Sequence, residues 1–256
     1  MKKIVMVLVI VACSLQLVCG AELVFYSYHD KAPYYGHVSG EGDALVTGIY
    51  SDFVQFLNAR QEVYRIRIEF LPRVRLDQKL ERGTLRGAVI GVNPVWFRDR
   101  ERTKYLWSAP FMHDEDVIIV RQGNTFPYEH PRDLVGKQLT LPRGLYWWGV
   151  TELIRDGKIQ AEETEQDLQN LEKVALGRSD ATITSVLSFK HLMRVHFPGG
   201  GLEALPTPHD RFERMLLFPR DQEEALRVLS PLLDSALDDP AWIKELEKYG
   251  YEIRMP

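Results

Sequence analysis

Residues 64–92 read YRIRIEFLPRVRLDQKLERGTLRGAVIGV, and this stretch decides the fold class. Its first seven residues alternate between apolar or aromatic and charged side chains, which indicates a half-buried strand. Pro72 is suited to open a short helix, and Gly83 is suited to stop it. The apolar run from Gly87 to Val92 is typical of a strand buried on both faces. Strand, helix and buried strand in succession predict a crossover unit of a parallel sheet.

The same alternation continues along the rest of the chain, which places the protein in the α/β class. Strands are predicted at 22–27, 117–120, 137–141, 181–184 and 214–218. Helices are predicted after a cap at Ser51 or Asp52 and at 145–154, 168–174, 186–195, 221–237 and 241–249. No low-complexity linker separates the elements, so we expect two lobes that share crossing strands, at the polar segments 113–116 and 208–210.

The N-terminus has the three-part layout of a secretory signal. Met1-Lys2-Lys3 is basic, Ile4 to Val18 is almost unbroken apolar sequence, and small residues follow at Gly20 and Ala21. The apolar run is shorter than the roughly 20 residues that span a bilayer. We therefore predict a signal peptide over 1–20 and export of the mature chain.

An alternative for the N-terminus is lipidation, because the residues ending at Cys13 resemble a bacterial lipobox. Cleavage after Gly20 would remove Cys13 and Cys19, the only cysteines, so disulfides would not stabilise the mature chain. It would also remove two lysines and no acid, which takes the formal charge from −4 to −6. A mildly acidic, mixed-charge protein has no bulk attraction for nucleic acid.

Seven short motifs follow one another along the chain, at 32–35, 48–52, 80–91, 108–111, 133–137, 176–181 and 242–250. In this order they resemble the bacterial family 3 solute-binding proteins, the periplasmic receptors of polar amino-acid ABC importers. The resemblance implies the type II periplasmic binding protein fold, with two α/β lobes, each a mostly parallel sheet flanked by helices. Two hinge strands would join the lobes, which would close on a ligand. We expect lobe 1 at 21–113 and 220–256 and lobe 2 at 114–219.

The chain departs from this family at three places that matter for the ligand. Ser185 stands where amino-acid binders place an aspartate for the ammonium group, and Tyr28 stands at a position that is often acidic. The hydroxyl-rich stretch before the family's carboxylate-binding arginine is replaced by Asn93 to Phe97. Arg98 and Arg102 both compete for the arginine position. These departures put an ordinary α-amino-acid ligand in doubt.

Aromatic walls and a few fixed polar groups are what a closing cleft needs. Tyrosines of the first loop and Trp96 could line it, while a guanidinium could hold a carboxylate through two parallel bonds. Gly144 precedes a predicted helix whose free N–H groups could hold an anion. Loop packing, a solvated charge run and a helix cap are the competing structural roles. The predicted ligand-binding residues are Tyr28, Tyr34, Asn93, Trp96, Arg98, Arg102, Gly144, Tyr146 and Ser185.

Enzyme signatures are missing from the sequence. It holds no metalloprotease, phosphate-loop, dinucleotide or nucleophile-elbow motif, and its seven histidines lack metal-ligand spacing. We therefore expect no catalytic residue, no metal and no cofactor. The predicted function is a monomeric periplasmic binding protein that delivers a small polar solute, such as an amino-acid-like compound, organic acid or amine, to an ABC importer. A receptor for a sensor or chemotaxis partner and a dehydratase-like enzyme on the same fold are the alternatives.

Overall fold

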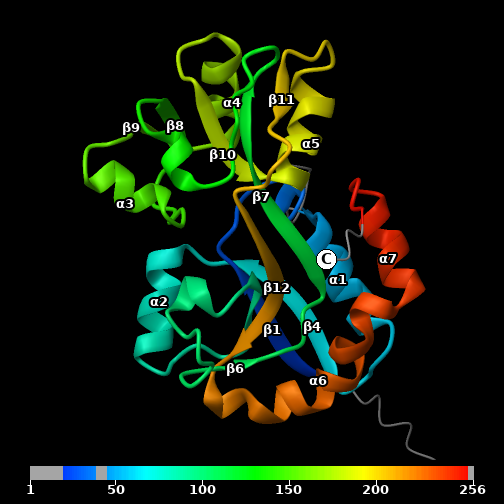
Figure 1. Ribbon diagram of the computed structural model, residues 1–256. Coiled ribbons are helices and arrows are strands. Elements are labelled where there is room, and N and C mark those ends of the chain that lie inside the picture. Colours follow the sequence, from blue (N-terminus) through cyan, green and yellow to red (C-terminus); the bar gives the residue numbers. More distant parts are fainter. Residues whose placement is uncertain (1–19, 39–44, 253–256) are drawn as a thin grey trace, which may run out of the picture.

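The computed structural model of the chain describes residues 20–38 and 45–252. These residues form a two-lobed α/β molecule, in which helices flank a curled sheet that runs through both lobes (Figure 1). The predicted signal peptide, with Cys13 and Cys19, lies outside the described residues except for Gly20. None of the helices in the described part is long and apolar enough to cross a membrane.

The main sheet is built from strands that lie far apart in the sequence. Its order is β4 (Tyr64–Phe70), β1 (Ala21–Ser27), β5 (Ala88–Val92), β12 (Asp210–Phe218), β7 (Met112–Arg121), β10 (Ala181–Ser185), β8 (Gln138–Pro142) and β9 (Gln160–Thr164). Two short strands extend it, because β6 (Leu106–Trp107) pairs with β12 and β11 (Leu202–Ala204) pairs with β7. A separate hairpin joins β2 (Gly36–Val38) to β3 (Leu45–Thr47).

The parallel pairing predicted from the alternating elements is confirmed in both lobes. In the first lobe β1 pairs in parallel with β4 and β5, and in the second lobe β8 pairs in parallel with β9 and β10. Strand β4 has the predicted bounds, and every residue of β5 is buried, as expected of a strand covered on both faces.

Two antiparallel strands, β7 and β12, connect the lobes (Figure 1). Asp210–Arg214 of β12 pair with β7, whereas Met215–Phe218 pair with β5 and β6 of the first lobe. The polar segment 113–116 lies within β7, at one of the two places where the sequence suggests a crossing. The lobe boundaries given above stay predictions, and the change of partner on β12 favours a second boundary near Met215.

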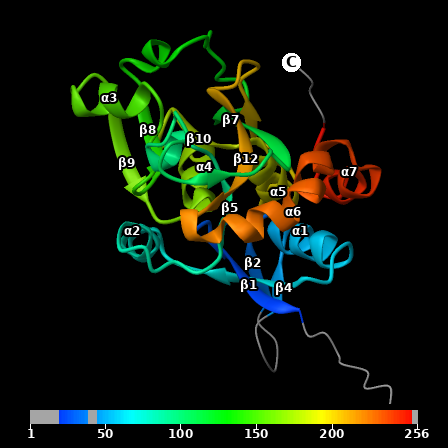
Figure 2. The ribbon, with the colours of Figure 1, turned by 90° about the horizontal axis from the view of Figure 1, so that it is seen from below.

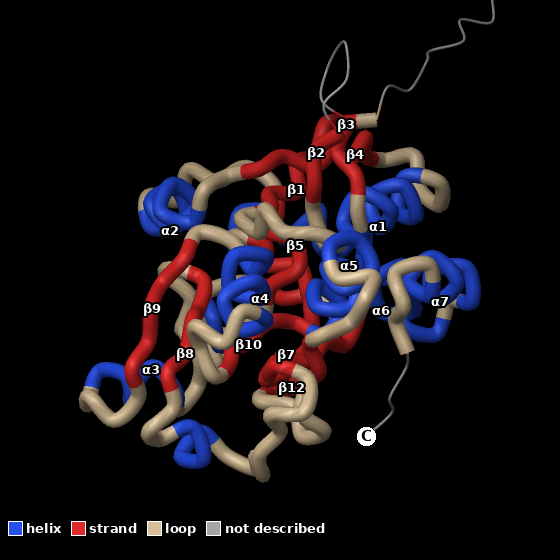
Figure 3. The backbone as a smooth tube through the Cα atoms, turned by 90° about the horizontal axis from the view of Figure 1, so that it is seen from above, coloured by secondary structure: helices blue, strands red, loops and turns tan. Residues whose placement is uncertain are grey.

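Within the described residues, four helices surround the first lobe's part of the sheet. Helices α1 (Ile49–Asn58) and α7 (Pro240–Glu247) lie side by side, and α2 (Arg73–Glu81) lies on the other side of the sheet (Figures 2 and 3). The fourth is α6 (Glu223–Ser235), and short turns of 3-10 helix are η1 (Val95–Phe97), η3 (Arg220–Gln222) and η4 (Ala236–Asp238).

An aromatic cluster holds α1 and α7 to Phe111, the residue before the crossing strand β7. The rings of Phe53 and Phe111 stack with 4.3 Å between centroids, and the Trp242 ring packs 4.8 Å from Phe53. The indole N–H of Trp242 donates to the Phe111 carbonyl at 2.7 Å, which satisfies its one polar group inside the core.

Helix α1 begins earlier than predicted, at Ile49, so a cap at Ser51 or Asp52 is wrong. The reason is Gly48, which has a φ of 106° and directs the chain into the helix. A Cβ on this residue would lie 2.5 Å from the Pro33 carbonyl oxygen, so only glycine allows that approach. The same carbonyl accepts the Ile49 N–H at 2.9 Å.

The second lobe packs α3 (Val150–Arg155), α4 (Asp167–Ala175), α5 (Val186–His196) and the turn η2 (Pro131–Leu134) around its strands. The prediction of a helix over 145–154 is wrong in its first half, because α3 begins only at Val150. Gly149 adopts a φ of 69°, which is outside the helical region. The Trp147 carbonyl instead closes the turn by accepting the Val150 and Thr151 N–H groups.

Candidate functional site

A cavity of about 340 Å³ lies between the two lobes. The first lobe contributes the loop that follows β1, and the second lobe contributes the ends of β8 and β9, the start of α4 and the end of α5. The lining residues are those at 28–32 and 165–168, with Pro142, Arg143, Leu145, Leu192 and His196. Its volume is at the lower end of the range for small-molecule pockets.

Direct contacts bridge the lobes at this cavity. The Lys31 ammonium of the first lobe lies 3.0 Å from a carboxylate oxygen of Asp167 and 3.3 Å from the Thr184 hydroxyl, both in the second lobe. The Ser188 hydroxyl on α5 donates to the Ala32 carbonyl oxygen at 2.7 Å. The structure therefore has closed lobes, and the same loop both lines the cavity and fastens the lobes together.

The first-lobe wall of the cavity is aromatic. The rings of Tyr28 and His29 lie 4.1 Å apart, and the His29 ring lies 5.8 Å from that of Trp96. Burial, with the neighbouring cations of Arg214, Lys31 and Arg73, lowers the pKa of His29 well below its usual value. His29 is therefore neutral at physiological pH, and it offers a ring face and a hydrogen bond, not a positive charge.

A buried ion pair, Arg214 with Asp114, joins the two crossing strands. The Arg214 guanidinium lies 2.6 Å from Asp114, and it also donates to the Gly91 carbonyl at 2.9 Å and to the Tyr50 hydroxyl at 3.0 Å. The pair is compensated by these bonds, as a buried charge must be.

Tyr34, predicted to line the cleft, belongs to this ion-pair cluster. Its side chain is fully buried, and its hydroxyl donates to Asp114 at 2.5 Å. The Arg214 guanidinium lies over its ring at 4.1 Å. Burial, followed by the charge of Asp114, raises the Tyr34 pKa well above its usual range. In this closed arrangement Tyr34 packs the hinge instead of presenting a wall to a ligand.

Asp116 lies where β7, β10 and β12 meet, opposite Ser185 on one side and Asp210 on the other. Burial raises its pKa from 3.8 to about 7, with further contributions from Asp114 and Asp210 that Lys31 and Arg214 oppose. Ser185 is 1% exposed, and its hydroxyl has no hydrogen-bond partner among the described residues. It directly precedes α5, but its side chain makes no capping bond.

Arg98 and Arg102 are exposed and do not line the cavity, which argues against a ligand clamp in this closed state. Both residues adopt the left-handed conformation, at φ 52° and 53°. The loop is organised from within by Asp99, which is 3% exposed. Its carboxylate accepts three backbone N–H groups and the Trp107 indole N–H. The arginines therefore lie on the outside of a loop that folds around an aspartate.

Asn93 and Trp96 also have structural roles in the turn that follows β5. The Asn93 side-chain oxygen accepts the N–H groups of Val95 and Trp96, which fixes the turn after β5. The half-buried Trp96 ring packs 5.0 Å from Phe212 and touches the aromatic wall through His29. Tyr28 is the one predicted ligand residue that lines the cavity directly.

The second-lobe candidates Gly144 and Tyr146 lie at the mouth of the cleft, next to lining residues Arg143 and Leu145. Gly144 has a φ of 74° and open space where a side chain would stand. Tyr146 is 54% exposed, and its hydroxyl donates to Glu152 at 2.8 Å. Of the two neighbouring tryptophans, Trp147 is buried in the lobe core and Trp148 is 57% exposed.

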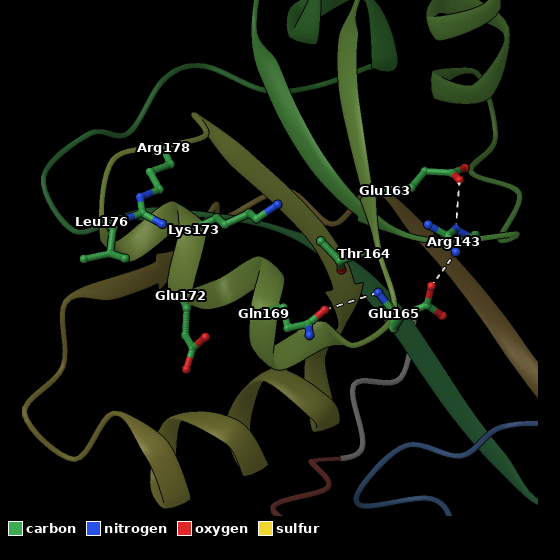
Figure 4. Close-up of a pocket in the computed structure, with 9 residues that line it drawn as sticks. All are labelled: Arg143, Glu163, Thr164, Glu165, Gln169, Glu172, Lys173, Leu176 and Arg178. Carbon is green, nitrogen blue, oxygen red and sulfur yellow. Dashed lines mark hydrogen bonds and ion pairs between the residues drawn. The ribbon is translucent and has the colours of Figure 1, made fainter.

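A second hollow, of about 440 Å³, lies on the surface of the second lobe between β9 and α4 (Figure 4). Two of its cations already have partners, because Arg143 lies between Glu163 and Glu165 (Figure 4) and Lys173 pairs with the neighbouring Glu162. It has walls from one lobe only, so closing the lobes would not enclose a ligand there. The interlobe cavity is therefore the better candidate for a binding site.

Sequence reasoning missed the charged residues of the site, Lys31, Asp167 and Arg214. Lys31 and Asp167 lie 136 positions apart, and neither belongs to a motif that marks a ligand group. The apolar spacing over 168–174 predicts helix α4, but it does not predict the direction of the Asp167 side chain. The described residues hold no group of three or more His, Cys, Asp or Glu side chains suited to a metal ion.

Comparisons with known proteins bear on the fold and on part of the sequence. The chain matches no protein-family model. Over 106 residues it is 32% identical to PatH of Vibrio harveyi, which is provisionally named an amino-acid ABC transporter-binding protein. This match spans 40% of the present chain and 40% of the Vibrio protein.

Solved structures match nearly the whole chain at low identity. A mutant of ArgBP from T. maritima has a TM-score of 0.67 and 17% identity, covering 91% of this chain and 96% of its own. A periplasmic binding protein of an arginine transport system from Legionella pneumophila has a TM-score of 0.66 and 15% identity, and the match covers 90% of this chain and 100% of that protein. A structure described for glutathione import through GshT and a cystine ABC importer of Streptococcus mutans has a TM-score of 0.69 and 16% identity. That match covers 90% of this chain and 95% of the other. The chain therefore has the two-lobed fold of type II periplasmic binding proteins, and part of its sequence is similar to an amino-acid ABC transporter-binding protein.

Proposed function

We propose that the protein is an exported solute-binding protein, which captures a small polar solute between its lobes and delivers it to an ABC importer. The observation that carries the proposal is the interlobe cavity, whose walls come from both lobes. A solute held there contacts the two lobes together only when they are closed. Its binding free energy then favours the closed state, which is how a ligand shifts such an equilibrium.

The similarity to PatH supports the importer part of the proposal, because that protein is named for binding to an amino-acid ABC transporter. Export to the periplasm is supported by the basic and apolar N-terminal sequence. We propose no catalytic activity for the protein. The cavity charges Lys31 and Asp167 are used to hold the lobes, and binding followed by release needs no bond to be made or broken.

Thermal unfolding of the exported protein with a panel of amino acids, organic acids, amines and short peptides tests this function. A true ligand raises Tm with its concentration, and at about 100 times Kd it adds about 2.7 kcal/mol to the free energy of unfolding. The ligand should be recovered chemically unchanged after incubation. Product formation would favour the enzyme alternative, and the absence of any stabilising compound would contradict solute capture.

Transport and export need a cellular measurement. Deleting the gene in the source bacterium should reduce uptake of the identified, labelled ligand, and the full chain should restore uptake. A chain without residues 2–20 should remain in the cytoplasm on fractionation and should not restore uptake. Normal uptake in the deletion strain would contradict the importer role while leaving ligand binding intact.

A further inference from the structure

Three carboxyl groups share one face of the crossing strands. Asp114 and Asp116 lie two positions apart on β7, and Asp210 on β12 stands directly opposite Asp116. Residues that stand opposite on an antiparallel pair are close neighbours, and like charges there are unfavourable. Arg214 neutralises Asp114 at 2.6 Å, so the repulsion remains between Asp116 and Asp210. We call Asp114, Asp116 and Asp210 the acidic hinge face.

The loop that follows β1 lies against the acidic hinge face, and it belongs to the first lobe. The Lys31 ammonium bonds the Thr184 hydroxyl at 3.3 Å, one residue before Ser185, which stands opposite Asp116 on β10. The same loop is fastened to the start of α5 through the Ser188 hydroxyl. Opening the lobes breaks these contacts, withdraws the loop and lets water reach Asp116.

The cations beside Asp116 are bound to other carboxylates. Lys31 and Arg214 are the cations that act on Asp116, but Arg214 pairs with Asp114 and Lys31 lies 3.0 Å from Asp167. Burial is consequently the largest influence on Asp116, and with the neighbouring carboxylates it raises the pKa of this group from 3.8 to about 7. A carboxyl group in water would have released its proton well below that pH.

Other titratable groups lie near β7 but do not face Asp116. Glu115 and His113 point to the opposite face of the strand, where Glu115 pairs with Arg211 at 3.4 Å. Helix α4 contributes Asp167, which the loop lysine already holds. Helix α5 contributes Lys190, whose ammonium donates at 2.9 Å to a backbone carbonyl that follows α7.

Histidine is the side chain that usually senses pH in this range, but the two histidines beside the acidic hinge face are neutral. His209 directly precedes β12, and its N–H donates to the Asp116 carbonyl at 2.7 Å. Burial lowers the pKa of His209 to about 4, and burial with nearby cations lowers that of His29 well below its usual value. The group of this region that gains or loses a proton near neutral pH is therefore Asp116.

We propose that closing of the lobes takes up one proton at Asp116, so that the protein closes more readily in mildly acidic than in alkaline surroundings. The proton comes from the solvent on closing and returns to it on opening. Because the closed state holds this proton up to about pH 7 and the open state loses it above 3.8, acid favours closing. The ratio of closed to open molecules falls by up to about 100-fold from pH 5 to pH 8.

Single-molecule fluorescence energy transfer on the protein without any solute measures this ratio. With C13S and C19S the exported protein has no thiol of its own, so dyes attach only at K79C and K158C. Lys79 is exposed on α2 of the first lobe and Lys158 is exposed after α3 of the second. Both helices lie on the same side of the molecule (Figure 1), so opening the cleft separates the dyes. We expect closed molecules at pH 5 and a ratio that is about 10- to 100-fold lower at pH 8.

Three variants assign the response. In D116N the ratio should change less than about twofold over the same range, because asparagine does not titrate. D210N removes the opposing charge and leaves Asp116 in place, so the fall should begin at a lower pH than in the unmodified protein. D234N removes a charge from an exposed position on α6 and should leave the response unchanged. D210N assigns the response even if D116N does not fold.

Several results would overturn the proposal. A ratio that stays constant with pH, an absence of closed molecules at pH 5, or a ratio that rises with pH would each do so. The last would mean that the loss of Lys31 on opening outweighs the loss of burial. A full response in folded D116N, or a D210N response at the unmodified pH, would assign the proton to another group. None of these results bears on solute capture, because no solute is present.

Discussion

At the scale of single residues, the ion pair of Arg214 with Asp114 is the most consequential contact of the hinge. Both side chains are almost completely buried, and each belongs to a different crossing strand. In the sequence, Asp114 stands in a run of polar residues and Arg214 starts an apolar strand, so each residue suits an exposed position. Only the register of β7 with β12 brings the two together.

Replacing Arg214 by methionine should destabilise the protein by about 3–5 kcal/mol, because the buried Asp114 charge loses its partner. Urea unfolding measures the change. R211M is the matched control, since Arg211 lies on the same strand and pairs with Glu115 while 68% exposed, so it should cost less than about 1 kcal/mol. Equal costs for the two variants would contradict the importance assigned to burial.

Asp116 should make stability depend on pH between about 4 and 7. Its folded pKa is raised to about 7, so the folded state holds a proton that the unfolded chain loses above 3.8. The contribution of this bound proton to the free energy of unfolding is therefore complete at low pH and disappears as pH rises through 7. The loss is at most about 1.4 kcal/mol for each pH unit.

Urea unfolding from pH 5 to 8 measures this contribution as a difference. The stability of D116N relative to the unmodified protein should rise by roughly 2–3 kcal/mol over that range, since asparagine does not titrate. D234N provides the reference for a charge change at the surface. A constant difference between D116N and the unmodified protein would show that Asp116 titrates normally.

At the scale of elements, patterns with a local cause were predictable, and those set by distant contacts were not. Strand β4 and helix α7 follow from alternation and from an Asp-Pro start, which act within a few residues. The start of α3 depends instead on Gly149 lying against Pro131, where a Cβ would come within 2.6 Å. Periodicity carries no information about such a contact.

The cap of α7 offers a test of a local cause, with R60A as a second control because Arg60 lies 3.6 Å from the Asp239 carboxylate. The Asp239 carboxylate accepts the Ala241 N–H at 2.8 Å, so D239A should destabilise the protein by about 0.5–2 kcal/mol. D238A is the control, because Asp238 is exposed and makes no capping bond. Thermal and urea unfolding compare the two. An equal effect from both would mean that charge, not the capping geometry, stabilises this end.

The candidate site was predictable only in outline. A cleft with aromatic residues between two lobes follows from the order of elements and from the resemblance. Its polar groups do not, because Lys31 comes from a loop and Asp167 from the start of α4, and the directions of both side chains depend on how the lobes close. Arg98 and Arg102 looked suitable as charges, but Asp99 turns their loop so that they face solvent.

At the scale of the whole molecule, the Lys31 to Asp167 pair should favour the closed state. Such a partly exposed pair contributes up to about 1 kcal/mol, so its loss would move the balance toward open lobes by as much as roughly fivefold. For K31A without ligand, small-angle X-ray scattering should give a larger radius of gyration. K158A, at an exposed turn of the second lobe, should match the unmodified protein. An unchanged K31A would place the closing contacts elsewhere, for example at Ser188.

The position of β12 between β5 and β7 has a consequence for the order of synthesis. The first lobe takes strands from the start of the chain and completes its sheet with Met215–Phe218 near the end. Until those residues emerge, β5 has one hydrogen-bonding edge uncovered, which is a hazard for aggregation. The elements of the second lobe all lie between these pieces and can pair as they appear. A segment made late in synthesis thus completes the sheet of the first lobe, and termination before it would leave an unpaired strand edge.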